Sequence, residues 1–361
     1  MRVALEQARA GEGCTRPNPP VGAVLVRKGK AMVQGYHRKA GGPHAEAGVL
    51  REAGARARGA TLYVTLEPCS TQGRTPPCTE AILASGVARV VVGASDPNPS
   101  HAGRGLRILR RAGLEVTARV CEAEARELIE PFGKWIQTGR PWVTLKLGMT
   151  LDGRIADVDG ASRWITGSKS RALTQSYRRR CDAVLVGAET ARLDNPSLLP
   201  RPARGRKPWR VVLSGDANLP TALQLFSDGL AERTLVLTTR RASSARRRRL
   251  ERTGAEVLVL PEESGRPSIA AMLEELGRRG LLHVLCEGGG QVAASLLKAG
   301  AADDLLLFHA PLLLGGAARA AIGSPGWALS EAPRLKRIWS RWCGDDHVML
   351  CRPLPASTSK K

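Results

Sequence analysis

The segment between residues 43 and 79 opens with Pro43-His44-Ala45-Glu46, runs through the apolar stretch Thr61–Leu66 and closes with Glu67-Pro68-Cys69-Ser70-Thr71-Gln72-Gly73-Arg74-Thr75-Pro76-Pro77-Cys78. It holds one imidazole, His44, and two thiols, Cys69 and Cys78. Three such groups can bind a tetrahedral Zn²⁺ ion whose fourth position stays open. Water at an open position ionises near neutral pH. The segment therefore predicts a catalytic zinc site.

The order of the residues adds a second indication. Glu46 follows His44 by two positions at the start of an expected helix over residues 44–55, and Cys78 begins another over residues 78–85, whose N-terminus favours a thiolate. His-x-Glu, then Pro-Cys, then Cys is the pattern of zinc deaminases, in which the carboxylate moves protons and does not bind the metal. Eight residues separate the two cysteines here, where two are usual. Two buried thiols and a capping histidine are the plain alternative, which the register of Glu46 disfavours.

Length and composition bound the class of protein. The 361 residues predict two domains. No apolar run reaches 18 residues, and Glu6, Arg9 and Glu12 interrupt any apolar leader, so we expect no membrane partner and no secretion. The eight cysteines are scattered and only two fall in a motif, which is typical of a reducing cytoplasm.

The net charge of +22 would attract polyanions, including nucleic acids. The longest basic run, Arg246–Arg249, lies in an expected surface helix over residues 243–253 that has no aromatic residues to stack on bases. We therefore expect no nucleic-acid partner, and we interpret the charge as an aid to gathering a phosphorylated small molecule.

The first half alternates strands and helices, which predicts a mixed sheet covered on both faces. The expected elements are helices over residues 1–10, 44–55, 78–85, 105–112 and 122–137 and strands over residues 21–26, 31–36, 61–66, 89–93 and 115–117. Ligands bind such sheets at the carboxyl ends of the strands. Asp96-Pro97-Asn98-Pro99 ends one strand and is either a plain turn or a ligand contact.

After the polar turn Thr138-Gly139-Arg140-Pro141, an α/β pattern begins again at residues 142–150. Further strands are expected over residues 183–186, 210–213, 233–237, 256–260, 283–286, 304–308 and 347–352. The strand that ends at Cys286 enters Glu287-Gly288-Gly289-Gly290 and an expected helix over residues 292–298, a pattern that fits either a phosphate cradle or a tight turn. Segment 162–167, after an expected hairpin over residues 153–160, and Asp194 favour the cradle. Taken singly, Trp164 also fits a core aromatic and Asp194 a turn cap.

Together these motifs resemble the bifunctional deaminase–reductases of riboflavin biosynthesis, from Gln7 to about Arg352. The resemblance rests on residues 17–22, 43–46, 65–70, 73–78 and 96–99 in the first half, and on residues 146, 151–156, 162–166, 194–196 and 287–289 in the second. It implies an α/β protein with an N-terminal cytidine-deaminase-like domain, residues 1–139, followed by a dihydrofolate-reductase-like domain, residues 140–361. It also implies a cytoplasmic homo-oligomer, a dimer or tetramer.

In the first domain the resemblance implies that His44, Cys69 and Cys78 bind zinc and that Glu46 is catalytic. Five further residues match positions that contact the pyrimidine or its phosphate: Asn18, His37, Arg74, Asp96 and Asn98. The long spacing of the cysteines is the family's own. Thr71 stands where the family usually has histidine, and the resemblance therefore assigns no substrate contact to this position.

In the second domain the resemblance implies NADPH as the cofactor. The matching cofactor positions are Gly148, Trp164, Thr190, Asp194, Gly289, Gly290, Gln291, Val292, Ala293, Ala294 and Ser295, and the matching substrate positions are Lys146, Ser162, Arg178, Leu198, Arg201 and Glu287. Ser214 stands at a position where the family often has aspartate, so Ser214 is left out of the set of cofactor residues. The implied reactions are deamination of 2,5-diamino-6-ribosylamino-pyrimidinone 5′-phosphate and then reduction of its ribosyl chain to ribityl.

Two other functions fit parts of the sequence. A deaminase of nucleic-acid bases would use the basic surface, but it has no need of a second domain that binds a nucleotide cofactor. A nucleic-acid-binding protein with a structural zinc would need a closed set of four ligands, whereas this motif offers three ligands and a carboxylate.

Overall fold

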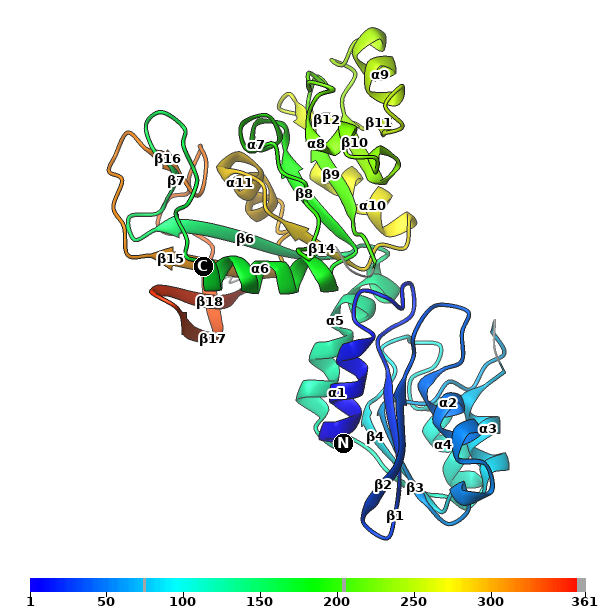
Figure 1. The fold of residues 1–361 in the computed structure, drawn as a ribbon. Helices are drawn as coiled ribbons and strands as arrows, with labels where there is room; N and C mark the ends of the chain where they lie inside the picture. The colour runs from blue at the N-terminus through cyan, green and yellow to red at the C-terminus, as the bar shows by residue number, and fades with distance from the viewer. Residues whose placement is uncertain (74–75, 203–205, 356–361) are drawn as a thin grey trace. The chain divides into compact units, whose positions relative to one another are not determined.

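The computed structural model describes residues 1–73, 76–202 and 206–355 and comprises two compact units, Met1–Pro141 and Trp142–Lys361 (Figure 1). Helix α5 (Glu122–Thr138) ends the first unit and is capped by Gly139, whose φ of 70° is left-handed. Strand β6 (Trp142–Thr150) begins the second. The boundary expected between residues 139 and 140 lies in the short connection between these two elements.

The first unit is built on a five-stranded sheet in the order β2-β1-β3-β4-β5. Its strands are β1 (Gly22–Arg27), β2 (Lys30–Tyr36), β3 (Thr61–Leu66), β4 (Arg89–Ala94) and β5 (Glu115–Thr117). Strand β1 pairs antiparallel with β2 and β3, while β3, β4 and β5 are parallel. The mixed sheet expected from the sequence is confirmed.

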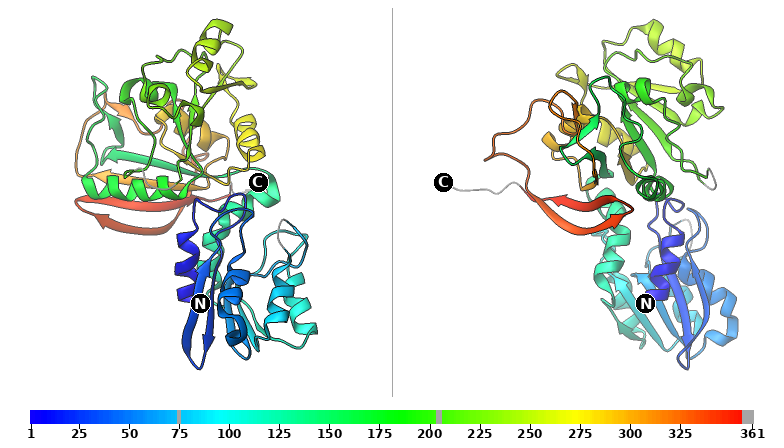
Figure 2. Two further views of the ribbon diagram at one scale, coloured as in Figure 1. Left: turned by 45° about the vertical axis from the view of Figure 1, so that its right-hand side comes forward. Right: turned by 60° about the vertical axis from the view of Figure 1, so that its left-hand side comes forward.

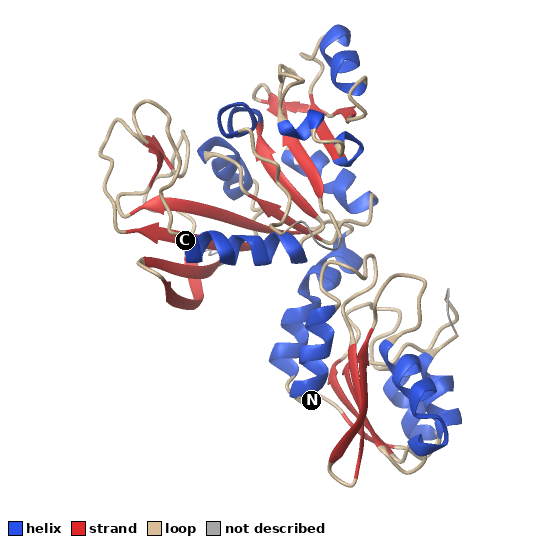
Figure 3. Ribbon diagram, in the orientation of Figure 1, coloured by secondary structure: helices blue, strands red, loops and turns tan. Residues whose placement is uncertain are grey.

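Helices cover both faces of this sheet (Figure 3). The helices are α1 (Arg2–Ala10) and α5 on one face, and α2 (Ala45–Ala53), α3 (Cys78–Ser85) and α4 (Arg104–Arg111) on the other; a 3-10 turn, Gly54–Ala57, follows α2. Leu62 and Val64 of β3 lie on the same face of the sheet, because side chains alternate along a strand, and they pack in the core with residues of α2 and α4. Leu66, the last residue of β3, packs instead with Ile129 of α5.

The second unit is built on a nine-stranded sheet in the order β11-β10-β9-β8-β14-β6-β15-β18-β17. Its strands besides β6 are β8 (Ala183–Gly187), β9 (Trp209–Leu213), β10 (Thr234–Thr238), β11 (Glu256–Val259), β14 (His283–Cys286), β15 (Asp304–Ala310), β17 (Leu335–Cys343) and β18 (Asp346–Pro353). The strands from β11 to β15 are parallel, and β18 and β17 add an antiparallel ribbon at one edge (Figure 2).

Two hydrophobic cores lie on the two faces of this sheet. Leu185 of β8 faces the core formed with α10 and α11, while Val184 and Val186 face the opposite core, which includes Leu250 of α9. The helices of this unit are α6 (Ser168–Arg180), α7 (Ala188–Asp194), α8 (Gln224–Ser227), α9 (Ser244–Glu251), α10 (Ile269–Arg278) and α11 (Gly290–Lys298), with a 3-10 turn, Ala231–Arg233. In the described residues no helix is both long and apolar enough to cross a bilayer.

The structure differs from the sequence-based expectations at residues 153–160, where a local hairpin was expected. Strand β7 (Arg154–Ala156) instead pairs antiparallel with β16 (Arg319–Ala320), far along the chain. Residues 157–161 form only a turn, in which the Ala161 carbonyl accepts from the Asp157 N–H. A second short ribbon pairs β12 (Glu262–Glu263) with β13 (Arg266–Pro267).

Candidate active sites

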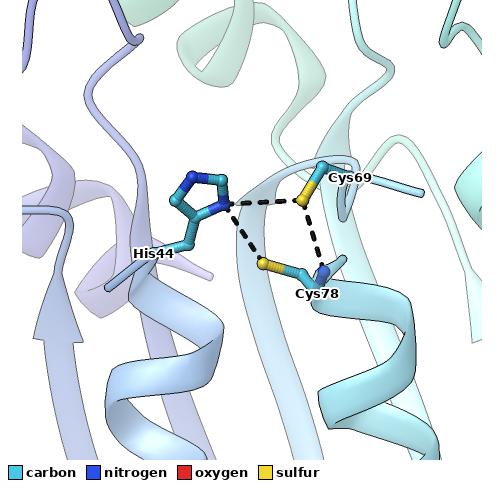
Figure 4. Close-up of side chains that lie close together, drawn as sticks. All are labelled: His44, Cys69 and Cys78. Carbon is cyan, nitrogen blue, oxygen red and sulfur yellow. Dashed lines mark hydrogen bonds between the residues drawn. The ribbon is translucent and has the colours of Figure 1, made fainter. Parts of the chain in front are cut away.

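The three expected metal ligands lie together at the carboxyl end of β3. His44 is the N-cap of α2, Cys78 is the first residue of α3, and Cys69 lies in the loop after β3. His44 Nδ1 is 3.2 Å from Cys78 Sγ and 3.5 Å from Cys69 Sγ (Figure 4). All three ligand atoms lie within 4.8 Å of one another.

This geometry fits a zinc ion. Zn–N bonds of about 2.0–2.1 Å and Zn–S bonds of about 2.3 Å at tetrahedral angles place nitrogen and sulfur about 3.6 Å apart. The two N–S distances in the structure are close to that value. Two N-terminal helix ends, those of α2 and α3, meet at the site and favour negative charge on the sulfurs.

Hydrogen bonds make one of the two thiols acidic. The hydrogen bond with Cys78 lowers the pKa of Cys69 to about 4, and His44 and the Cys78 N–H, 3.3 Å from Cys69 Sγ, act in the same direction. The same hydrogen bond raises the pKa of Cys78, and burial raises it further. Cys69 is therefore the sulfur that accepts hydrogen bonds at this site, from the Cys78 thiol and from the Cys78 N–H.

Glu46 stands next to these ligands without joining them. It lies in the first turn of α2 and is only 3% exposed. Burial raises its pKa, partly offset by the nearby His44. A carboxylate with a raised pKa can both take up and release a proton near neutral pH, as general acid–base catalysis requires.

A cavity of about 220 Å³ opens beside these residues and is lined by His44, Glu46 and Cys69. Four expected substrate residues share its lining: Asn18, His37, Asp96 and Asn98. His37 Nδ1 lies 2.9 Å from the Pro43 carbonyl, which can only accept, so Nδ1 carries the proton. Nε2 then accepts from Asn18 Nδ2 at 3.1 Å, which leaves the Asn18 side-chain oxygen as an acceptor. Arg74, the fifth expected substrate residue, lies outside the described residues.

A buried carboxylate, Glu67, holds the loop that carries Asp96. Its Oε2 accepts from the N–H groups of Asp96 at 3.2 Å and Gly103 at 2.9 Å, and its Oε1 accepts from Gly105 at 2.9 Å. Glu67 therefore fixes the 96–103 loop and caps the N-terminus of α4 at once. The sequence alone does not reveal this role, because Glu67 is simply the residue before Pro68-Cys69 in the motif.

We expect Glu67→Gln to destabilise the first unit. An amide offers one acceptor oxygen and places N–H donors opposite backbone N–H donors. We therefore expect the free energy of unfolding to fall by about 2–3 kcal/mol. That corresponds to a fall of about 4–12 °C in the Tm of the unit's thermal unfolding. Glu52→Gln, an exposed change on α2, is the control and should leave Tm unchanged. Equal Tm values for the two variants would contradict the role given to Glu67.

The second unit has its own cavity, of about 550 Å³, at the carboxyl ends of β6 and β14. Arg178 of α6 and Glu287 after β14 form a bidentate ion pair there, at 2.7 and 2.9 Å. Burial disfavours the charge on Glu287, but Arg178 and Lys146 more than offset this, so its pKa is lowered. Lys146 Nζ lies 5.5 Å from the ring centre of Phe308, and burial lowers its pKa. The cavity thus contains charged groups held in fixed positions.

All six expected substrate residues of this unit line that cavity: Lys146, Ser162, Arg178, Leu198, Arg201 and Glu287. Gly148 lies beside them, and a Cβ there would come within 3.1 Å of Lys146 Nζ. Trp164 also lines the cavity. The guanidinium of Arg171 lies over its ring, at 4.4 Å from the ring centre. Ser162 Oγ donates to Asp194 Oδ1 at 2.8 Å.

A larger cavity, of about 740 Å³, adjoins this one and shares Ser162, Thr190, Asp194 and Gly289 with it. Its lining includes six of the expected cofactor residues beyond Asp194: Thr190, Gly289, Gly290, Gln291, Val292 and Ser295. Ala293 and Ala294 are instead buried and lie outside its lining, because they face into the fold from α11.

The N-terminus of α11 fits a phosphate-bearing cofactor. A Cβ at Gly290 would come within 2.5 Å of the Ala320 carbonyl, so only glycine allows this approach. The Gly289 N–H donates to Thr190 Oγ1 at 3.1 Å, which anchors the turn. A helix N-terminus lined by glycine is suited to a phosphate, and the cavity volume is suited to a nucleotide cofactor.

Several lining residues were missed by the sequence-based analysis. His101 and Phe132 line the first cavity, and His101 Nδ1 lies 3.4 Å from Thr71 Oγ1, the position where histidine is usual. His101 follows Asp96-Pro97-Asn98-Pro99 closely, so its place next to that motif was a usable signal. Arg241 and Arg266 line the 740 Å³ cavity, but nothing distinguishes them among 55 lysines and arginines in the sequence.

Comparison with known families matches each of the two units to one family. Residues 1–94 match the family described as the cytidine and deoxycytidylate deaminase zinc-binding region, and residues 141–349 match the RibD C-terminal domain. Riboflavin biosynthesis protein RibD of Bacillus amyloliquefaciens is 41% identical over 98% of this chain and 95% of its own length. The Escherichia coli protein of the same name is 39% identical over 96% of both chains.

Solved structures extend the similarity to the whole fold. RibD of Acinetobacter baumannii superposes with a TM-score of 0.86 at 36% identity over 98% of both chains. A Thermotoga maritima protein has the same TM-score and identity over 98% of this chain and 97% of its own, and is described as a diaminohydroxyphosphoribosylaminopyrimidine deaminase and 5-amino-6-(5-phosphoribosylamino)uracil reductase. The expected fold of a cytidine-deaminase-like domain followed by a reductase domain is confirmed. The chain therefore belongs to the RibD family of riboflavin biosynthesis, bifunctional enzymes that join a zinc-dependent deaminase to an NADPH-dependent reductase.

Proposed function

We propose that the chain deaminates 2,5-diamino-6-ribosylamino-pyrimidinone 5′-phosphate in residues 1–139 and reduces the ribosyl chain of the product to ribityl in residues 140–361. The observation that carries the first half is the His44–Cys69–Cys78 cluster beside buried Glu46 at the edge of a cavity. The cavity of the second unit, which adjoins a cofactor-sized cavity, supports the second half.

In the deaminase, His44, Cys69 and Cys78 would hold the zinc ion. When bound, zinc supplies the Lewis acidity that makes water a nucleophile at neutral pH. Glu46 takes a proton from that water and delivers one to the amine, which leaves as ammonia while a carbonyl replaces it. Asn18 and Asp96 orient the pyrimidine ring through an acceptor oxygen and a carboxyl group.

In the reductase, the residues at the junction of the two cavities position the reactants. NADPH supplies the hydride when it is bound. Lys146 presents an ammonium whose lowered pKa makes it a stronger proton donor than a solvated lysine. Arg178 is fixed by Glu287 and, with Arg201, provides cations for the phosphorylated ribosyl chain.

The proposed partners are small molecules, and the chain itself in a dimer or tetramer, without nucleic acid. The basic run of α9 is partly engaged within the fold, since Arg246 pairs with Asp216 at 2.9 Å and Arg249 donates to the Leu219 carbonyl at 3.2 Å. All eight cysteines are free thiols, which supports action in the reducing cytoplasm.

The test couples the two reactions in one assay. We expect wild type to release one ammonia and oxidise one NADPH per aminopyrimidine consumed. Removal of zinc by a chelator should stop ammonia release and leave reduction of the pre-deaminated substrate intact, because the reductase residues lie in the other unit. Two results would contradict the proposal. One is oxidation of NADPH with the aminopyrimidine as substrate but without ammonia release, and the other is deamination that survives loss of zinc.

A further inference from the structure

The lining of the 740 Å³ cavity includes four arginines: Arg192, Arg241, Arg266 and Arg319. Arg319 is neutralised by Glu189 at 2.6 Å, and Arg192 donates to a backbone carbonyl. Among the described residues, the guanidinium groups of Arg241 and Arg266 make no hydrogen bond or ion pair within the protein. Two cations without a carboxylate partner therefore border this cavity.

Contacts between backbone segments hold these two arginines near each other. Thr239, the residue after β10, donates its hydroxyl at 2.7 Å to the carbonyl of Gly215, which follows β9. A Cβ on Gly215 would lie 2.5 Å from the Gly265 carbonyl in the β12–β13 turn. A Cβ on Gly265, whose φ is +78°, would lie 2.7 Å from Arg241 Nη1. The guanidinium of Arg241 therefore lies beside Gly265, and Arg266 is the residue that follows Gly265.

The carboxylate at the same place is already engaged. Asp216 pairs with Arg246 at 2.9 Å, and its other oxygen accepts the Asn218 N–H at 3.1 Å. In dinucleotide sites a carboxylate that binds the ribose hydroxyls favours NAD, whereas an arginine accommodates the extra phosphate of NADP. Here the carboxylate is occupied and the arginines are available. Ser214, which also lines the cavity, donates its hydroxyl to Asp216 Oδ1 at 3.4 Å and so adds to the engagement of this carboxylate.

We propose that Arg241 and Arg266 bind the 2′-phosphate of NADPH and thereby select it over NADH. A guanidinium presents paired N–H donors that match the oxygens of a phosphate monoester, which carries a charge that NADH lacks at this position. The inference rests on the proposed place of the cofactor in this cavity, with the nicotinamide end toward Ser162 and Asp194, which line both cavities.

The test measures binding by calorimetry with the full chain, using NADPH, NADH, 2′,5′-ADP and 5′-AMP as probes. We expect Arg241→Ala and Arg266→Ala each to raise the Kd for NADPH and 2′,5′-ADP about tenfold, and the double variant about a hundredfold. The Kd values for NADH and 5′-AMP should stay within about twofold. Arg240→Ala is the matched control, because Arg240 is an exposed neighbour outside the cavity lining.

The outcomes separate this inference from the proposed function. Equal loss of NADPH and NADH binding, or unchanged NADPH binding in the double variant, would overturn the assignment of the two arginines. A rise confined to the KM of the pyrimidine substrate would assign them to the substrate's phosphate and would also overturn it. Failure of wild type to bind either dinucleotide would instead contradict the proposed reductase site. Ammonia release, which uses the other unit, should be unchanged in every variant, and unchanged NADH binding would confirm that the second unit is folded.

Discussion

Replacing Glu46 with glutamine is expected to slow ammonia release about 10²- to 10⁴-fold while zinc stays bound. The amide has nearly the same shape and can occupy the buried position in the first turn of α2, but it cannot take up the water's proton. The zinc ligands His44, Cys69 and Cys78 do not include Glu46, so the metal content should remain at that of wild type.

Ammonia release, zinc content and NADPH-dependent reduction of the pre-deaminated substrate should be measured on the same preparation. The reduction rate should be unchanged, since its proposed residues lie in the second unit. Glu52→Gln, on the exposed face of the same helix, should behave as wild type in all three assays. A Glu46→Gln enzyme that deaminates at the normal rate would show that the proton carrier is another group.

Replacing Lys146 with methionine is expected to lower kcat of the reduction about 10²- to 10⁴-fold, because the variant keeps the length of the side chain and loses the proton donor. Only the protonated amine can donate, so kcat/KM of wild type for reduction should fall as pH rises through the pKa of Lys146. That fall should come below the usual lysine range, because burial lowers this pKa. The variant should lose this limb of the pH profile.

The matched control is Lys169→Met, an exposed lysine of α6 that does not line the cavity. Ammonia release should be unchanged in both variants. A Lys146→Met enzyme with unchanged kcat and only a higher KM for the pyrimidine would assign Lys146 to binding alone.

The zinc cluster could be predicted from the sequence because its determinants are local. His44 and Cys78 stand at the starts of two helices, and Cys69 lies in the loop after strand β3. Each side chain is therefore placed by the element beside it, and helices and strands of this kind are readable from periodicity and capping. The glycine turn before α11 was readable for the same reason.

Elements without a periodic apolar pattern could not be predicted. Helix α6 carries Arg178 into the substrate cavity, yet it buries only Ser170 and Thr174 deeply, so its sequence has no apolar stripe. The β7–β16 pair joins residues more than 160 positions apart, which no local pattern records. Glu67 and the pair Arg241 and Arg266 depend on loops that meet only in the folded chain.

The most direct test of the zinc-based account is X-ray absorption at the zinc edge of the full-length protein as purified. The account predicts one zinc per chain with two sulfur ligands at about 2.3 Å and one imidazole nitrogen at about 2.0–2.1 Å, completed by a light atom in the fourth position. Cys78→Ala should lower the sulfur count and the zinc content together. A shell of four sulfurs, or one with nitrogen and oxygen alone, would contradict a catalytic metal held by His44, Cys69 and Cys78.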